Sequence, residues 1–131
     1  MRVFIADDST VVVERLADLL KGVPGVELIG QAGDVPEAVR CIQQLSPDAV
    51  ILDLKMPGGT GLDVLRAIRP DHPGLHIVIC TNFPYPQYRE QCFNAGANFF
   101  LDKSTEFDRI PAILRELIQN ASKSFSAARG G

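Results

Sequence analysis

An apolar run at residues 49–52 ends abruptly in the carboxylate of Asp53, and the segment that follows, 57–61, contains one proline and three glycines. The run has the length and composition of a strand buried on both faces of a parallel sheet, and the segment after it favours a loop. A carboxylate is costly to bury unless it is paired or binds a metal. In open α/β sheets, ligands bind at the carboxyl ends of the strands. Asp53 is therefore the first candidate for chemistry.

Other polar residues follow other predicted strands. Asp7 and Asp8 come directly after the first strand, Thr81 ends the fourth, and Lys103 follows the fifth. Because parallel strands point their carboxyl ends the same way, we expect all of these side chains to meet Asp53 at one edge. Three carboxylates there repel one another unless a cation is present, and oxygen ligands suit Mg²⁺ or Mn²⁺. Lys103 adds a positive charge and Thr81 a hydroxyl donor.

A metal, a lysine and a hydroxyl around one aspartate are the groups that phosphoryl transfer needs. The metal and the ammonium offset charge on the phosphoryl oxygens, while the carboxylate acts as the nucleophile. Asp53 lies on the predicted central strand, so it is the natural phospho-acceptor.

Five predicted strands alternate with five predicted helices. The strands are expected at 2–6, 26–32, 49–52, 75–81 and 98–101, and the helices at 10–22, 34–45, 61–69, 87–95 and from about 108. Ser9 is a predicted N-cap, and Asp34 with Glu37 forms a capping-box pattern. This alternation predicts right-handed βαβ units and a parallel sheet covered on both faces, that is, a doubly wound α/β domain. The domain is expected to cover 1–120, and 121–131, where the apolar periodicity stops, is expected to be a flexible tail.

The pattern as a whole resembles the receiver domain of two-component response regulators, over residues 1 to about 120. The resemblance is carried by the following motifs: Asp7-Asp8, Asp53 with Met56-Pro57 and Gly61, Thr81, and Gly96-Ala97 followed by Phe99-Phe100 and Lys103. It implies a flavodoxin-like (βα)5 fold with strand order 2-1-3-4-5.

The resemblance also implies roles for individual residues. Asp53 would accept a phosphoryl group from a histidine kinase or a histidine phosphotransfer protein. Asp8, Asp53 and the main-chain carbonyl of Lys55 would bind Mg²⁺, with Asp7 contributing through water. Thr81 and Lys103 would contact the phosphoryl oxygens, and movement of Thr81 would be coupled to rotation of the ring of Phe100. Such a protein is not a conventional enzyme, but it assists its own phosphorylation and autodephosphorylation.

The chain departs from common usage in this family at several positions. Lys55 and Phe83 stand two residues after Asp53 and Thr81, at positions that flank the path of a hydrolytic water. Phe100 replaces a commoner tyrosine, and Ser104 stands where proline is frequent. The lifetime of the phosphorylated form is therefore left open.

Composition restricts the partners. The net charge of −3 gives no basic face for nucleic acid, and no apolar run is long enough to span a membrane. Cys41, Cys80 and Cys92 lie in apolar segments and are interpreted as core thiols of a cytoplasmic protein. We expect switching of a surface formed by the fourth helix, fifth strand and fifth helix, which binds a downstream protein unless an output domain lies outside this chain. A monomer and a weak dimer both remain open.

The sequence leaves room for other functions. A small phosphohydrolase that works through an aspartyl-phosphate would need an Asp-x-Asp pattern after the first strand, which is absent. A flavodoxin-type nucleotide module would need a first loop rich in phosphate-binding donors rather than carboxylates. A receiver-like binding module that works without phosphorylation is a further alternative. The aromatic segment 83–88 either packs on itself or faces a partner.

Overall fold

The computed structural model describes the backbone of residues 1–130 and the side-chain environments of residues 1–121. Its centre is a parallel five-stranded sheet in the order β2-β1-β3-β6-β7. The strands are β1 (Arg2–Ala6), β2 (Glu27–Ala32), β3 (Ala49–Leu52), β6 (His76–Thr81) and β7 (Phe99–Asp102). Numbered as the main strands alone, this is the predicted order 2-1-3-4-5, so the doubly wound α/β fold is confirmed.

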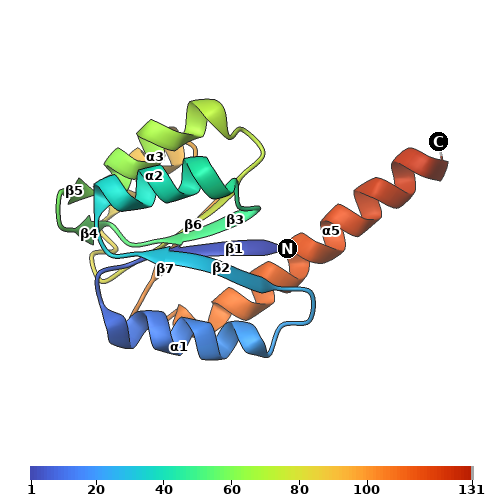
Figure 1. Ribbon diagram of the computed structural model, residues 1–131, viewed down its shortest axis with the longest axis horizontal. Coiled ribbons are helices and arrows are strands. Elements are labelled where there is room, and N and C mark those ends of the chain that lie inside the picture. Colours follow the sequence, from blue (N-terminus) through green and yellow to red (C-terminus); the bar gives the residue numbers. More distant parts are fainter. Residues whose placement is uncertain (131) are drawn as a thin grey trace.

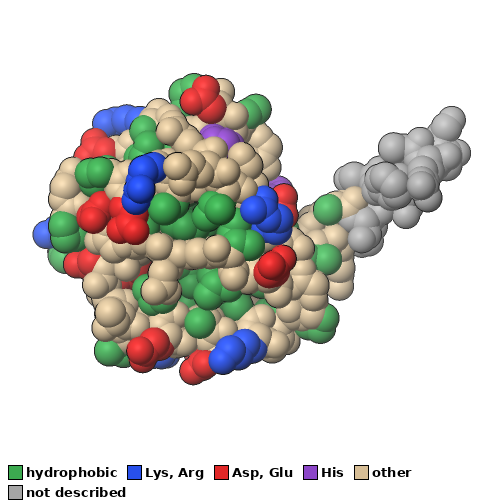
Figure 2. Space-filling model, in the orientation of Figure 1, with side chains coloured by type: hydrophobic (Ala, Val, Ile, Leu, Met, Phe, Trp, Pro, Cys, Tyr) green, Lys and Arg blue, Asp and Glu red, His purple; other side chains and the backbone are tan. Residues whose placement is uncertain are grey.

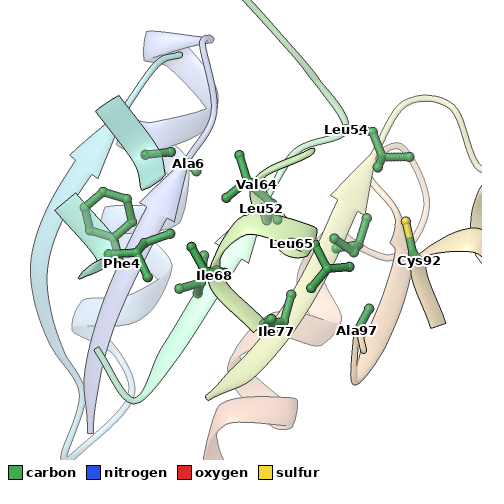
Figure 3. Packing of buried hydrophobic residues seen from close by; sticks show 14 of the residues in the cluster. Phe4, Ala6, Leu52, Leu54, Val64, Leu65, Ile68, Ile77, Cys92 and Ala97 are labelled. Carbon is green, nitrogen blue, oxygen red and sulfur yellow. The ribbon is translucent and has the colours of Figure 1, made fainter. Parts of the chain in front are cut away.

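Helices cover both faces of the sheet (Figure 1). They are α1 (Thr10–Lys21), α2 (Val35–Leu45), α3 (Gly61–Ile68), α4 (Pro86–Asn94) and α5 (Ile110–Gly130). Helices α1 and α5 pack on one face, over a core that includes Val3, Leu16 and Leu114. Helices α2, α3 and α4 pack on the other, over a core that includes Phe4 and Leu65 (Figure 3).

The alternation of buried side chains follows from the pleat of the strands. In β1, Val3 and Ile5 contact one core, while Phe4 and Ala6 contact the other. All four residues of β3 are buried, as expected for a central parallel strand. This strand therefore holds its carboxyl end, where Asp53 begins, in a rigid position.

Side-chain caps fix the starts of the helices around that edge. The Ser9 hydroxyl accepts a hydrogen bond from the N–H of Val12 at 3.3 Å, and the Asp34 carboxylate accepts one from the N–H of Glu37 at 2.8 Å. The predicted N-cap at Ser9 is confirmed, and Asp34 caps α2 as predicted, but the return bond from the Glu37 side chain that would complete a capping box is not formed. A full capping box that the sequence analysis missed joins Thr60 and Asp63 at the start of α3.

The segment between Asp53 and α3 is more ordered than the predicted loop. It forms a two-residue antiparallel ribbon in which β4 (Lys55–Met56) pairs with β5 (Gly59–Thr60). Gly58 and Gly59 adopt positive φ angles of 86° and 146° at the turn. Such angles are open to glycine without strain, and the turn therefore fits this sequence.

The last helix differs from its prediction at both ends. A 3₁₀ turn, Phe107–Arg109, precedes it, and the helix continues to Gly130 instead of giving way to a tail at 121. Figure 1 shows its last turns extending beyond the sheet. Loss of apolar periodicity signals the loss of a buried face, whereas alanine, lysine and arginine still favour helix. The domain boundary at 120 and the flexibility of 121–131 remain predictions.

Charged side chains of both signs are scattered over the face drawn in Figure 2. Among the described residues, no helix has the length and apolar composition that crossing a membrane requires.

Candidate functional site

Four neighbouring strands each deliver one polar residue to the carboxyl edge of the sheet. Asp7 follows β1, Asp53 follows β3, Thr81 ends β6 and Lys103 follows β7. The sheet hydrogen bonding continues into these residues. The N–H of Asp53 donates to the carbonyl of Ala6 at 2.9 Å, and the N–H of Lys103 donates to the carbonyl of Thr81 at 2.8 Å. The predicted convergence on one edge is therefore observed.

The ammonium of Lys103 lies between two buried carboxylates. Its Nζ donates to Asp7 Oδ2 at 2.7 Å and lies 3.3 Å from Asp53 Oδ2. The three side chains are only 9%, 5% and 8% exposed, in the order Lys103, Asp7, Asp53. Solvent and salt screen such a group of charges weakly. The other oxygen of Asp7 accepts the N–H of Ser9 at 2.9 Å, which fixes this carboxylate against the start of α1.

Burial sets the protonation behaviour of the site. Burial raises the pKa of Asp53, and the attraction of Lys103 opposes this only in part. Burial also lowers the pKa of Lys103, but its hydrogen bond to Asp7 and its attraction to both carboxylates outweigh that effect and leave the pKa raised. Lys103 is therefore a cation, and Asp53 is a carboxylate that still lacks part of its charge compensation.

The carboxylates have the arrangement that a divalent cation needs. One oxygen from each of Asp7, Asp8 and Asp53 lies within 4.8 Å of the others. Asp8 is exposed, whereas Asp7 and Asp53 are buried, so the cluster opens to solvent on the side of Asp8. Three carboxylates face one ammonium, and hard oxygen donors with room for water are the usual environment of Mg²⁺. The residues fit this ion. The backbone N–H of Lys55 hydrogen-bonds the Asp53 carboxylate, while a role for the carbonyl of Lys55 remains a prediction.

Thr81 is fully buried beside this cluster. Its Oγ1 accepts the N–H of Phe83 at 2.9 Å, which leaves its hydroxyl proton free to donate. Phe100 is 5% exposed and Phe99 is half-buried, and the pleat of β7 places the two rings against opposite cores. Rotation of Phe100 as a switch remains a prediction. The peptide between Lys103 and Ser104 is trans, because the described residues contain no cis peptide bond.

Lys55 and Phe83 contact each other, which the sequence analysis did not predict. The Nζ of Lys55 lies 4.3 Å from the centre of the Phe83 ring, a cation–π distance. These residues follow Asp53 and Thr81 from two different strands, so the pair crosses the edge of the sheet beside the acceptor. Their spacing from Asp53 and Thr81 was visible in the sequence, but nothing in the sequence indicated that the two side chains would touch.

Gly61 holds α3 against the acceptor. A Cβ atom at this position would lie 2.1 Å from the carbonyl oxygen of Asp53, a distance that no folded chain accommodates. The N–H of Gly61 donates to the carbonyl of Leu54 at 2.8 Å. Only glycine lets the helix start this close to the strand that carries Asp53, so this position requires a residue without a side chain.

The three cysteines and the aromatic segment 83–88 differ in burial. Cys80 and Cys92 are buried free thiols, as predicted, whereas Cys41 is only half-buried. The aromatic segment packs on itself, which was one of the two alternatives, while contact with a partner remains a prediction. Phe83, Tyr85 and Tyr88 lie against one another, with ring centres 6.4 Å and 5.8 Å apart, yet Tyr85 remains 51% exposed.

Comparison with known proteins agrees with this geometry. The family model of the response regulator receiver domain matches residues 3–115. A curated relative, the uncharacterized transcriptional regulatory protein YvfU of Bacillus subtilis, is 33% identical over 119 residues, which are 91% of this chain and 60% of that protein. The chain spans about half the length of the curated relatives it matches.

Two solved structures extend the comparison. A DNA-binding response regulator of the LuxR family from Staphylococcus aureus has a TM-score of 0.80 at 27% identity, with 88% of this chain and 96% of that chain covered. The CheX-CheY-BeF3-Mg+2 complex from Borrelia burgdorferi has a TM-score of 0.76 at 25% identity, with 87% and 89% covered.

The names of these relatives bear on one expectation. Transcriptional regulators and a DNA-binding protein are among them, which is partly at odds with the expectation that nucleic acid is not a partner. Fold, strand order, edge residues and family model agree on one assignment: this chain belongs to the response regulator receiver domains of two-component systems.

Proposed function

We propose that Asp53 accepts a phosphoryl group from a histidine kinase or a histidine phosphotransfer protein, in a reaction that depends on Mg²⁺ or Mn²⁺. The observation that carries this proposal is the buried cluster in which Lys103 lies between Asp7 and Asp53. A carboxylate with incomplete charge compensation, beside a fixed ammonium and two further oxygen ligands, suits a group that must bind a cation and then a phosphoryl group.

In this reaction an Asp53 oxygen attacks the phosphorus of the donor phosphohistidine, the P–N bond breaks, and the imidazole leaves. Lys103 donates to one phosphoryl oxygen and Thr81 donates its hydroxyl proton to another. When bound by Asp8, Asp53 and the carbonyl of Lys55, with Asp7 acting through water, the divalent cation supplies positive charge to the phosphoryl oxygens. Attack of water on the phosphorylated Asp53 returns the carboxylate and releases inorganic phosphate.

Phosphorylation adds about −1.5 to −2 charge units at neutral pH. Thr81 moves toward the new oxygens and vacates space that the ring of Phe100 occupies in the phosphorylated state. These two movements change the surface formed by α4, β7 and α5, and thereby the binding of a partner. A downstream protein is one such partner. Because relatives are transcriptional regulators, a DNA-binding output domain in a longer protein is the other, and the described residues themselves have no role in contacting DNA. We place the protein in the cytoplasm, as a monomer or weak dimer.

The mass of the intact protein after incubation with acetyl phosphate tests the site. We expect one phosphoryl adduct on the wild type in the presence of Mg²⁺, and none without Mg²⁺ or on Asp53→Asn. Asp48→Asn is a suitable control, because Asp48 accepts the N–H of Arg2 at the opposite end of the sheet. An adduct that persists on Asp53→Asn would overturn the assignment of the acceptor.

A further inference from the structure

A half-open pocket of about 150 Å³ lies between the β4–β5 ribbon and α4. Its walls are mostly apolar or aromatic, and include Leu54, Leu62, Phe83, Tyr88 and Cys92. Figure 3 shows Leu54 and Cys92 at one end of the core on this side of the sheet. A cavity of about this volume accepts a single six-membered aromatic ring. The pocket begins where the acceptor strand ends, but none of its walls is a carboxylate of the phosphorylation site.

One exposed tyrosine lines this pocket and a second packs against it. Tyr88 is 38% exposed and Tyr85 is 51% exposed, and their ring centres are 5.8 Å apart. Helix α4 makes little contact with the core, since Cys92 is its one buried residue. Exposed tyrosines beside a pocket of this size are typical of the centre of a protein-binding surface, where an aromatic side chain of the partner enters the pocket.

One cation, Lys55, lines the pocket, and a second, Arg66, lies near enough to the lining residue Cys92 to act on it electrostatically. Lys55 lies over Phe83 at the rim, and Arg66 lies one helical turn after Leu62 on the same face of α3. Within residues 1–121, neither forms a salt bridge. The carboxylate of Asp63 at this end of α3 accepts hydrogen bonds from the N–H and the hydroxyl of Thr60. The whole chain carries a net charge of −3, so these two cations are not part of a generally basic surface.

We infer that this α3–α4 pocket binds a protein partner through an acidic segment that inserts one aromatic side chain. The ring fills the apolar pocket beside Phe83 and Tyr88, and flanking carboxylates pair with Lys55 and Arg66. This surface is separate from the α4–β7–α5 surface, because Arg89 and Phe93 lie on the other side of α4. There the guanidinium of Arg89 lies 5.1 Å from the Phe93 ring and donates to the carbonyl of Phe100 on β7.

Three short peptides separate the contributions of the ring and of the charges. Acetyl-Asp-Phe-Asp-amide carries both features, acetyl-Asp-Ala-Asp-amide lacks the ring, and acetyl-Lys-Phe-Lys-amide reverses the charge. Titration into unphosphorylated, ¹⁵N-labelled protein is followed by amide chemical shifts, so the result does not depend on the proposed phosphorylation. We expect saturable shifts at 54–62 and 83–92 with the first peptide, in the millimolar range or tighter. The other two should bind at least about tenfold more weakly.

Matched variants locate the binding surface. Tyr88 and Phe93 are both 38% exposed on α4, so Tyr88→Ala and Phe93→Ala remove similar rings from its two sides. We expect Tyr88→Ala to weaken the first peptide about tenfold and Phe93→Ala to change it less than about twofold. Lys55→Gln and Arg66→Gln should also weaken it, with Arg89→Gln as their control. Circular dichroism checks that each variant is folded.

Several results would overturn the inference. Equal binding of all three peptides would show that neither the ring nor the charge is recognised. Shifts confined to β7 and α5, or a larger loss with Phe93→Ala than with Tyr88→Ala, would place the binding surface on the other side of α4. Equal affinity for phenylacetate and the first peptide would assign the pocket to a small aromatic acid instead of a protein.

Discussion

At the scale of single residues, Lys103 determines the electrostatics of the site. Its ammonium compensates two carboxylates that are less than a tenth exposed. The convergence of Asp7, Asp8, Asp53 and Lys103 could be predicted, because parallel strands share one direction. The pairing of Lys103 with particular carboxylates could not be predicted. The sequence did not indicate which of the three carboxylates Lys103 would contact, and only the side-chain conformations place Lys103 on Asp7 and Asp53 while Asp8 remains exposed.

Removing this ammonium tests its importance. We expect Lys103→Met to lower the free energy of unfolding by about 3 kcal/mol, because two buried carboxylates lose their shared cation. Lys21→Met is the control. Lys21 forms an ion pair with Asp18 in which the two side chains are 79% and 78% exposed. Loss of this ion pair should lower the free energy of unfolding by less than about 0.5 kcal/mol. Urea unfolding in buffer without divalent cations measures both. Equal effects would contradict burial of the Lys103 charge.

We also expect Lys103→Met to retain some phosphorylation on Asp53 but to lose the response of the partner surface.

The contact between Lys55 and Phe83 leads to a prediction about the phosphorylated form. Because the pair crosses the edge of the sheet beside Asp53, we expect it to restrict the approach of water. We expect Phe83→Ala to shorten the lifetime of the phosphoryl group by roughly two- to fivefold, as expected for loss of an exposed cation–π contact. The decay of the phosphorylated mass after removal of acetyl phosphate measures this lifetime. Tyr85→Ala, which removes a neighbouring exposed ring, should leave it unchanged. A longer lifetime in Phe83→Ala would exclude shielding.

At the scale of elements, the helices that border the site begin close to their predicted positions, because their signals are local. Caps, glycines and apolar spacing lie within one or two turns of each helix start. The β4–β5 ribbon was missed because four paired residues carry too little pattern to distinguish them from a loop. The length of α5 was missed because apolar periodicity indicates only which residues are buried. A helix can continue beyond its last buried residue, and no such periodicity marks that part.

The start of α3 provides a test at this scale. We expect Gly61→Ala to lower the free energy of unfolding by about 2 kcal/mol or more, because the added Cβ would overlap the Asp53 carbonyl oxygen at 2.1 Å. The backbone after Asp53 must then move, so the rate of phosphorylation by acetyl phosphate should fall as well. At Gly74 an added Cβ meets nothing within 4 Å, and Gly74→Ala should change neither quantity appreciably. Unchanged phosphorylation in Gly61→Ala would show that the site does not need this close approach.

At the scale of the whole molecule, the sheet separates two cores, and each contains one buried thiol. Cys80 belongs to the core under α1 and α5, and Cys92 to the core under α2, α3 and α4. Sequence alone predicted thiols in apolar segments, but not on which face each would lie, since that depends on strand and helix orientation. It overestimated the burial of Cys41 for the same reason.

These two thiols make stability depend on pH in the alkaline range. Burial raises the pKa of Cys80 to about 12 and that of Cys92 to about 11, from 9.0. Below pH 9 the thiols are protonated in the folded and the unfolded chain, so they have no effect on pH dependence. Above pH 9 the unfolded chain releases both protons and the folded chain retains them, so the free energy of unfolding falls as pH rises. The expected slope is about 1.4 kcal/mol per pH unit for each thiol, up to about pH 11. Urea unfolding at pH 8 to 11 measures this slope. The double variant Cys80→Ala, Cys92→Ala retains the lysines and tyrosines, so the difference between its slope and that of the wild type is the contribution of the two thiols. If the two proteins lost stability in parallel, the thiols would not be the buried groups that couple folding to proton release.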